Sequence, residues 1–395
     1  MTSIYLHIPF CESKCIYCDF NSYAGLDHLF ADFVDALCAD IARGPERDTL
    51  ARLAPAPPDV PDNAEVGRVA TIFFGGGTPS VLPPEAIGRI LDTVARHYAV
   101  APDAEISMEA NPGTITEANF CGYRAAGVNR LSMGVQSFDD AQLQAIGRIH
   151  TAAEAVDAYE RARRAGFDNI NLDFIFGLPG QDLANWDATL RRAATLGTDH
   201  LSCYSLIVEE HTPLWLQVEK GQVVVPGEDA VADMYELCQA TLAAVGYQQY
   251  EISNWSRPGK ECVHNLVYWR GLPYLGFGPG AHGYFGGRRY WTMLSPKKYV
   301  AALRAGDSAL AGAEWIAPDL AMGEFMMLGL RTTAGIAPSE FAARFGRPFE
   351  TVYGPLARQL RDWGLLEVEP ARDVIRLTNR GLLLGNEVFA RFLPD

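Results

Sequence analysis

The sequence has no apolar run long enough to span a membrane as a helix, which takes about 20 residues. Its first residues are neither signal-like nor amphipathic and Arg-rich, so we expect a cytoplasmic protein that does not itself span a membrane. Positive charge is scarce, because 33 Lys and Arg stand against 48 Asp and Glu and the net charge is −15. This balance argues against nucleic acid as a general partner, while local basic patches stay open.

The sequence also lacks the regular cysteine spacing of a disulfide framework. Three of its eight cysteines lie together near the N-terminus, and four of the other five have apolar neighbours, as reduced core cysteines do. A length of 395 residues exceeds one ordinary domain, and 48% hydrophobic with 21% charged residues is typical of a globular protein. We therefore expect two or three domains with a large core.

The three grouped cysteines, Cys11, Cys15 and Cys18, form a C-x3-C-x2-C motif. They follow the alternating stretch Ile4–Ile8, which predicts a short strand, so they belong to the loop that leaves this strand. A loop can turn three sulfurs toward one point, and three thiolates suit a soft metal or an iron–sulfur cluster. A structural zinc site usually takes four protein ligands, and no nearby Cys or His at zinc-finger spacing offers the fourth. The remaining alternative is three unrelated buried cysteines.

Strand-like and helix-like segments alternate over the first half of the chain. The predicted strands are 4–8, 69–74, 104–109, 129–135, 168–175 and 200–206, and the predicted helices are 28–43, 84–98, 115–126, 139–146, 152–165 and 182–196. Six strands joined by crossovers predict an α/β fold with a parallel sheet, and we expect a partial, six-stranded barrel. The Pro- and charge-rich stretch 44–67 is predicted to be a long surface loop.

Chemically informative residues come directly after these strands. They are the cysteine motif, Gly75 to Thr78, Glu109, Gln136 and Asp173. The carboxyl ends of parallel strands form one face, which carries the site in barrels and open α/β sheets. We therefore predict that these residues share a pocket.

Each of these residues has a less specific interpretation. The run Gly75–Gly77 lets a ligand approach bare backbone, but glycine turns are common after strands, and no Gly-Lys-Ser/Thr follows to indicate a phosphate loop. Glu109 could instead cap a helix or lie on the surface. Asp173 is a lone acid in a strand apolar enough to be buried, so it needs a partner, for which a ribose hydroxyl and Arg148 are the candidates.

Five motifs carry a family resemblance over nearly the whole chain. They are Tyr5-Leu-His-Ile-Pro-Phe before the cysteines, Phe74-Gly-Gly-Gly-Thr-Pro, Glu109-Ala-Asn-Pro, Met133-Gly-Val-Gln-Ser, and Leu172-Asp173 with Gly177-Leu-Pro-Gly180. In combination they resemble the radical S-adenosylmethionine (SAM) superfamily. The chain is similar to its HemN/HemW branch, which contains oxygen-independent coproporphyrinogen III dehydrogenase and a heme chaperone. This resemblance implies a partial (β/α)6 barrel of the radical SAM type.

The resemblance also implies cofactors. A [4Fe-4S] cluster would be held by Cys11, Cys15 and Cys18, with SAM chelating the open iron and Tyr17 near its adenine. Positions that match SAM contacts are Tyr5, Gly76, Gly77, Thr78 and Glu109, and positions that match a second SAM site of the dehydrogenase are Gln136, Arg148, Asp173 and Ile207. An electron donor would reduce the cluster, and cleavage of the sulfonium would yield a 5′-deoxyadenosyl radical.

Two features distinguish the branches. The dehydrogenase is expected to carry one more Cys two residues after the third, where this chain has Phe20. The segment His264-Asn-Leu-Val-Tyr268-Trp269 is similar to the HNxxYW signature of heme chaperones, which implies heme contact by His264, Tyr268 and Trp269. Imidazole can ligate heme iron, and aromatic rings offer flat apolar surface to the macrocycle. The alternative is that His264 satisfies backbone polar groups and the two aromatic residues are core.

The C-terminal third changes character. Predicted helices at 320–330, 338–345 and 349–363 precede strands at 366–369 and 374–378, a turn between them, and a closing helical segment. This outline is winged-helix-like and resembles the HemN C-terminal domain; with the acidic balance, a lid or docking role is favoured over DNA binding. We predict a radical SAM core over 1–210, an extension with the HNxxYW segment over 211–317, and a HemN C-terminal-like domain over 318–395.

Three functions follow from the resemblance. The preferred one is a heme chaperone that binds heme and delivers it to an acceptor such as a membrane respiratory protein. The second is a radical SAM enzyme, either the coproporphyrinogen dehydrogenase or a methyl- or methylene-transferring relative. The third is a cluster-binding scaffold without catalysis, which the full set of SAM-contact positions disfavours.

Overall fold

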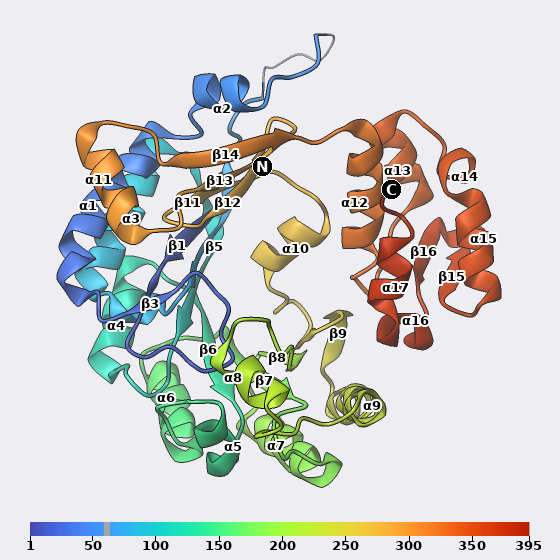
Figure 1. The fold of residues 1–395 in the computed structure, drawn as a ribbon, viewed down its shortest axis with the longest axis horizontal. Helices are drawn as coiled ribbons and strands as arrows, with labels where there is room; N and C mark the ends of the chain where they lie inside the picture. The colour runs from blue at the N-terminus through green and yellow to red at the C-terminus, as the bar shows by residue number, and fades with distance from the viewer. Residues whose placement is uncertain (59–63, 395) are drawn as a thin grey trace.

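The computed structural model describes residues 1–58 and 64–394, and its centre is a curved sheet of twelve strands (Figure 1). The parallel strands at its centre are β1 (Thr2–Ile8), β4 (Val69–Gly76), β5 (Val100–Ala110), β6 (Arg130–Gln136), β7 (Ile170–Phe176) and β8 (His200–Ser205), adjacent in that order. They are the six strands that the sequence predicts. The expected α/β fold with a partial parallel barrel is therefore confirmed.

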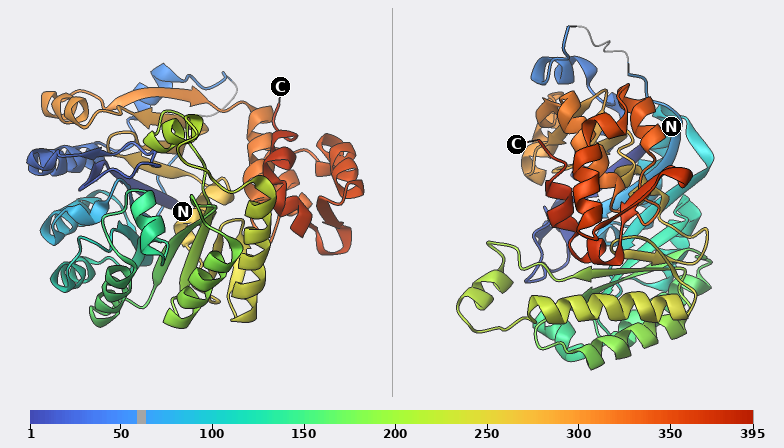
Figure 2. Two further views of the ribbon diagram at one scale, coloured as in Figure 1. Left: turned by 60° about the horizontal axis from the view of Figure 1, so that its bottom comes forward. Right: turned by 90° about the vertical axis from the view of Figure 1, so that its right-hand side faces the viewer.

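Helices cover the outer face of this sheet (Figure 2). They are α1 (Phe30–Arg43), α3 (Pro84–His97), α4 (Glu117–Ala126), α5 (Asp140–Ala145), α6 (Ala152–Arg164), α7 (Leu183–Leu196) and α9 (Glu228–Ala244). In α1, Phe33, Leu37 and Ile41 are spaced four residues apart and are buried, so one stripe of the helix faces the core. Capping boxes at Thr116 and Thr151 fix where α4 and α6 begin.

The sheet continues beyond the predicted strands at both edges. On the β1 side lie β11 (Tyr274–Phe277), β12 (His282–Phe285), β13 (Arg288–Thr292) and β14 (Leu310–Trp315), and on the β8 side lie β10 (Asn254–Ser256) and β9 (Gln248–Glu251). Only β11 of these pairs in parallel, with β1. The strands are three to six residues long and are stabilised by pairing with distant segments, so local pattern gives them little signal.

Shorter elements fill the connections. They are β2 (Phe10–Cys11), β3 (Tyr23–Ala24), η1 (Asp27–Leu29), α2 (Arg47–Leu53), η2 (Pro79–Val81), α8 (Pro213–Glu219), α10 (Val263–Trp269) and α11 (Pro296–Ala305). The presence of α2 corrects the prediction of an irregular loop over 44–67, because Leu50 packs into the main core and holds a short helix there. Part of that predicted loop, 59–63, lies outside the described residues.

A C-terminal unit lies beside the open side of the barrel, next to α10 (Figure 1). It contains α12 (Pro318–Gly329), α13 (Pro338–Phe345), α14 (Phe349–Val352), α15 (Gly354–Asp362), β15 (Leu366–Glu369), η3 (Pro370–Arg372), β16 (Val374–Leu377), α16 (Asn379–Leu383) and α17 (Gly385–Ala390). Phe325, Phe341 and Leu360 belong to its own hydrophobic cluster. The unit thus has helices, a two-stranded hairpin and a closing helical segment. No helix in the described part of the chain is long and apolar enough to cross a membrane.

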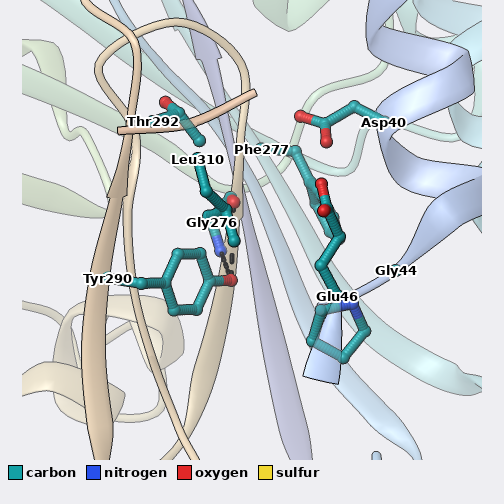
Figure 3. Close-up of a pocket in the computed structure, with 9 residues that line it drawn as sticks. Asp40, Gly44, Glu46, Gly276, Phe277, Tyr290, Thr292 and Leu310 are labelled. Carbon is teal, nitrogen blue, oxygen red and sulfur yellow. Dashed lines mark hydrogen bonds between the residues drawn. The ribbon is translucent and has the colours of Figure 1, made fainter. Parts of the chain in front are cut away.

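Asp40 is a buried carboxylate that ties α1 to the turn after β11. It borders a cavity of about 10 Å³, which is room for about one water, together with Glu46 and Tyr290 (Figure 3). Its Oδ2 accepts hydrogen bonds from the Tyr299 hydroxyl at 2.6 Å and from the Gly278 N–H at 3.3 Å. Burial raises the pKa of Asp40 to about 6, although these two hydrogen bonds oppose the shift.

The raised pKa of Asp40 predicts a pH-dependent stability. Because the folded-state pKa exceeds the ordinary value of 3.8, the stabilisation is complete below that value and is lost as the pH rises through about 6. Between pH of about 4.5 and 7, the wild-type free energy of unfolding should fall by about 2 kcal/mol relative to that of Asp40→Asn. Urea denaturation of both proteins across this range measures the difference, and parallel pH curves would contradict the assignment.

Candidate functional site

The three cysteines lie on the loop after β1, at the carboxyl ends of the parallel strands. Each thiol is partly exposed and unpaired by disulfide. Each sulfur has a side-chain hydrogen-bond partner: Thr78 Oγ1 at 3.5 Å from Cys11, Arg148 Nη1 at 3.4 Å from Cys15, and Ser22 Oγ at 3.9 Å from Cys18. Across residues 1–58 and 64–394, no three His, Cys, Asp or Glu side chains are placed to hold a single metal ion. A set of three soft thiol donors fits an iron–sulfur cluster better than such an ion.

The glycine run Gly75–Gly77, at the end of β4, packs directly against β1 and the start of the cysteine loop. Gly77 N–H donates to Ile8 O at 2.8 Å, and Thr78 N–H donates to Phe10 O at 2.7 Å. A Cβ on Gly77 would lie 2.5 Å from Phe10 O, and Gly76 has a φ of +115° with the His7 ring against its α-carbon. Close approach of backbones therefore requires these glycines, in addition to the ligand access that the sequence suggests.

Glu109 on β5 and Asp173 on β7 lie near each other toward the carboxyl ends of these strands. Glu109 Oε2 accepts a hydrogen bond from the Gly76 N–H at 3.1 Å, which places the carboxyl group beside the glycine run. Exclusion from water raises the pKa of Glu109 to about 8, and the nearby charge of Asp173 adds to this shift. Burial also raises the pKa of Asp173. Two neighbouring carboxyl groups whose pKa values are both raised by burial favour a ligand that brings positive charge.

Asp173 has one partner on the neighbouring strand β6 and one on its own strand β7. Its Oδ2 accepts from the Ser132 hydroxyl at 3.0 Å, and its Oδ1 accepts from the Asn171 amide at 2.7 Å. Arg148, the partner considered from the sequence, instead donates to Cys15 Sγ, Gly134 O and Asn111 Oδ1. Alternation of polar and apolar residues from Asn169 to Asp173 is the sequence signal that could have predicted an inward-facing polar row.

The other predicted residues take different positions around the pocket. The Tyr5 hydroxyl and His7 Nδ1 share a hydrogen bond of 3.0 Å beside the glycine run, and the histidine tautomer decides which of them donates. Tyr17 packs against the small apolar cluster of Ile146, Ile175 and Leu178, and burial raises the pKa of its hydroxyl.

Gln136 ends β6 with a φ of +68°, in the left-handed region. Ile207 lies after β8 and is 66% exposed, so it reaches the rim rather than the interior.

The HNxxYW segment forms α10, which packs against β4 and α12. The His264 ring is fully buried, with Nδ1 at 2.7 Å from Thr71 Oγ1 and Nε2 at 2.9 Å from the Tyr268 hydroxyl. Burial, together with the charge of Arg130, lowers the pKa of His264 to about 3, so the ring is neutral. Both ring nitrogens are hydrogen-bonded to side-chain hydroxyl groups, and not to the backbone polar groups that the alternative to iron ligation supposed.

Two charged residues that the sequence analysis missed lie beside this segment. Glu105 on β5 accepts hydrogen bonds from the N–H groups of Val263 and His264, both at 3.0 Å, and so caps the first turn of α10. Arg130 on β6 is 2% exposed, and its charge contributes to the lowered pKa of His264. Glu105 and Arg130 lie near the amino ends of predicted strands and belong to no recognisable motif, so only the three-dimensional fold reveals that they lie near His264.

Comparison with known proteins places this geometry in a family. Family models of the radical SAM superfamily and of the HemN C-terminal domain match residues 5–193 and 316–384. The heme chaperone HemW of Bacillus subtilis is 38% identical over 100% of both chains, and that of Mycobacterium tuberculosis is 39% identical over 99% of this chain and 94% of its own. A solved structure of coproporphyrinogen III oxidase (HemN) from Escherichia coli, described as a radical SAM enzyme, matches 99% of this chain and 89% of its own, with 25% identity and a TM-score of 0.81.

A partial barrel with three cysteines on the loop after its first strand defines a radical SAM protein. The chain belongs to this superfamily, within the HemN/HemW branch, as the full-length relatives show. Those full-length curated relatives carry the name heme chaperone HemW.

The close contact at Gly77 predicts a stability defect. In Gly77→Ala the added methyl group would overlap the Phe10 carbonyl, so we expect the free energy of unfolding to fall by about 1–3 kcal/mol. Gly88→Ala, within α3, is the matched control, because its methyl group would meet Ala126 of α4 at an ordinary 3.7 Å. Alanine also favours the helix over glycine by about 1 kcal/mol, so this variant should not be destabilised. Chemical denaturation should separate the two variants, and equal stability would refute the packing argument.

Proposed function

We propose that the chain is a heme chaperone that binds heme, a [4Fe-4S] cluster and SAM, and that delivers heme to an acceptor protein. Similarity over the whole length to proteins named heme chaperone HemW is the observation that carries this proposal. Phe20 adds support, because a 70% exposed phenylalanine stands where the dehydrogenase is expected to have a further cysteine. The acceptor and the electron donor for the cluster are partners that the proposal requires, and we place the protein in the cytoplasm.

The proposal assigns the residues at the strand ends to the cofactors. Cys11, Cys15 and Cys18 would hold the cluster, and the bound group would supply one-electron chemistry toward SAM. One SAM molecule would contact Tyr5, Tyr17, Gly76, Gly77, Thr78 and Glu109. The residues that match a second SAM site are Gln136, Arg148, Asp173 and Ile207. The two carboxyl groups with raised pKa values suit a sulfonium, because its charge favours their ionised forms.

The HNxxYW segment is the proposed heme contact. Tyr268 and Trp269 are partly exposed, and the Tyr268 ring meets the Tyr274 ring edge-on at 4.8 Å between centroids. Because both nitrogens of His264 are hydrogen-bonded, ligation of iron by this ring would require breaking one of these bonds. We therefore assign His264 the role of orienting Tyr268, and the two aromatic side chains the role of contacting the macrocycle.

We assign these roles to three domains with the bounds 1–210, 211–317 and 318–395. The first would carry the cluster and SAM, and the second would carry the heme contact through α10. The third has its own hydrophobic cluster and touches α10 through α12, which suits a unit that senses or covers the heme segment.

Glu109 provides a test of the SAM site. At pH values above about 8 wild-type Glu109 is ionised, and Glu109→Gln should weaken SAM binding by about tenfold or more, since hydrogen bonds to charged groups contribute about 1.5–3 kcal/mol. The difference should shrink as the pH falls below about 8, because wild-type Glu109 then holds a proton. Equilibrium dialysis under anaerobic conditions measures both affinities. Glu117→Gln on the surface of α4 is the control, and an unchanged affinity in Glu109→Gln at high pH would contradict the assignment.

Heme titration tests the function itself. We expect the anaerobically reconstituted protein to bind heme, followed by its Soret absorbance, and a Tyr268→Ala/Trp269→Ala double variant to bind at least tenfold more weakly. His264→Ala should also bind more weakly because Tyr268 loses its hydrogen bond, whereas His97→Ala, at an exposed histidine of α3, should bind as the wild type does.

Unaltered heme affinity in both His264→Ala and the double variant would refute the proposed contact. The same preparation, supplied with dithionite, SAM and coproporphyrinogen, should form no protoporphyrinogen. Formation of that product would favour the alternative of a radical SAM dehydrogenase, and 5′-deoxyadenosine without it would favour a different radical enzyme.

A further inference from the structure

Arg148 lies between the cysteine loop and the end of β6, where its guanidinium group contacts a cluster ligand. Its Nη1 donates a hydrogen bond to Cys15 Sγ at 3.4 Å. Its Nη2 donates to Gly134 O at 2.7 Å and to Asn111 Oδ1 at 3.3 Å. Three acceptors on three different segments therefore fix the plane and position of the guanidinium group.

The backbone beside Arg148 is fastened to the same loop. Ile16 N–H donates to Ile146 O at 3.4 Å, and a Cβ on Gly147 would lie within 3.3–3.4 Å of Ile16. The segment before Arg148 thus packs on the residue that follows Cys15. The backbone contact and the side-chain hydrogen bond therefore join the Arg148 segment to the same part of the cysteine loop.

The three thiols differ in the charge that they face. Within the described part of the chain, Cys15 is the one cluster cysteine whose sulfur is hydrogen-bonded to a cationic side chain, since Thr78 and Ser22 offer neutral hydroxyl groups. Lys14 also lies near Cys18, but its side chain is exposed and donates to backbone carbonyls, so water and salt screen its charge.

We propose that Arg148 raises the reduction potential of the [4Fe-4S] cluster, an inference that rests on the proposed function because Cys15 would ligate that cluster. Reduction takes one electron from a low-potential donor, changes the cluster from 2+ to 1+, and makes or breaks no covalent bond. With three thiolates the net charge passes from −1 to −2. A fixed cation hydrogen-bonded to one of the sulfurs stabilises the more negative state more strongly.

A potentiometric titration monitored by electron paramagnetic resonance tests the proposal. In Arg148→Gln, the ratio of reduced to oxidised cluster at a fixed ambient potential should fall about tenfold, which corresponds to 59 mV for one electron. Arg148→Lys keeps the charge and should restore most of the wild-type ratio. Arg191→Gln removes an exposed charge from α7, far along the chain, and should leave the ratio unchanged.

Asn111→Asp provides a second route to the same result, because a carboxylate beside the guanidinium would offset its charge without removing it. We expect the reduction potential of Asn111→Asp to fall, by less than that of Arg148→Gln. If Arg148→Gln fails to hold a cluster, the potential of Asn111→Asp tests the role of the Arg148 charge instead. Equal potentials in variants with wild-type iron and sulfide content would overturn the role of Arg148. Failure of the wild-type chain to assemble a cluster would instead overturn the proposed function.

Discussion

The close approach of β4 to β1 is the constraint on which the site depends. Two glycines without side chains let the end of β4 hydrogen-bond to Ile8 and Phe10 at the start of the cysteine loop. The same contact brings Thr78 to Cys11 and the Gly76 N–H to Glu109. A single backbone junction therefore joins the cysteine loop to the carboxyl group of Glu109, and a methyl group at this place would change all of these contacts together.

Aromatic contacts extend this junction toward α10. Phe73, one position before Phe74 on β4, stacks on Tyr5 with 6.3 Å between ring centroids and on His264 with 5.1 Å. His264 in turn holds Tyr268 by a hydrogen bond. The cysteine-loop face of the barrel and the HNxxYW segment are thus joined by a packed row of rings.

Local pattern predicted much of this fold because the six central strands are buried and followed by amphipathic helices, which gives strong periodicity. It did not predict β9 to β14, whose short segments depend on partners far along the chain, or α2, which depends on Leu50 reaching the core. Within the site, the strand ends bring Glu109 to Gly76 and Thr78 to Cys11. Arg130, Glu105 and the partners of Asp173 escaped prediction, since burial of a charge and choice of partner follow from three-dimensional neighbours and not from spacing.

The electrostatics of the pocket favour a cationic ligand over an anionic one. Glu109 and Asp173 are enclosed near each other, and each has a raised pKa because ionisation is costly without water or a compensating charge. Arg148 donates through Nη1 to Cys15 and through Nη2 to Gly134 and Asn111, and it makes no hydrogen bond or ion pair with either acid in the described part of the chain. A ligand that inserts positive charge beside Glu109 would lower both pKa values and gain their ionised carboxylates as partners. The cationic Arg148 thus lies against a thiol of the cysteine loop while the acidic Glu109 lies against the glycine run, and this division follows from which strand end supplies each residue.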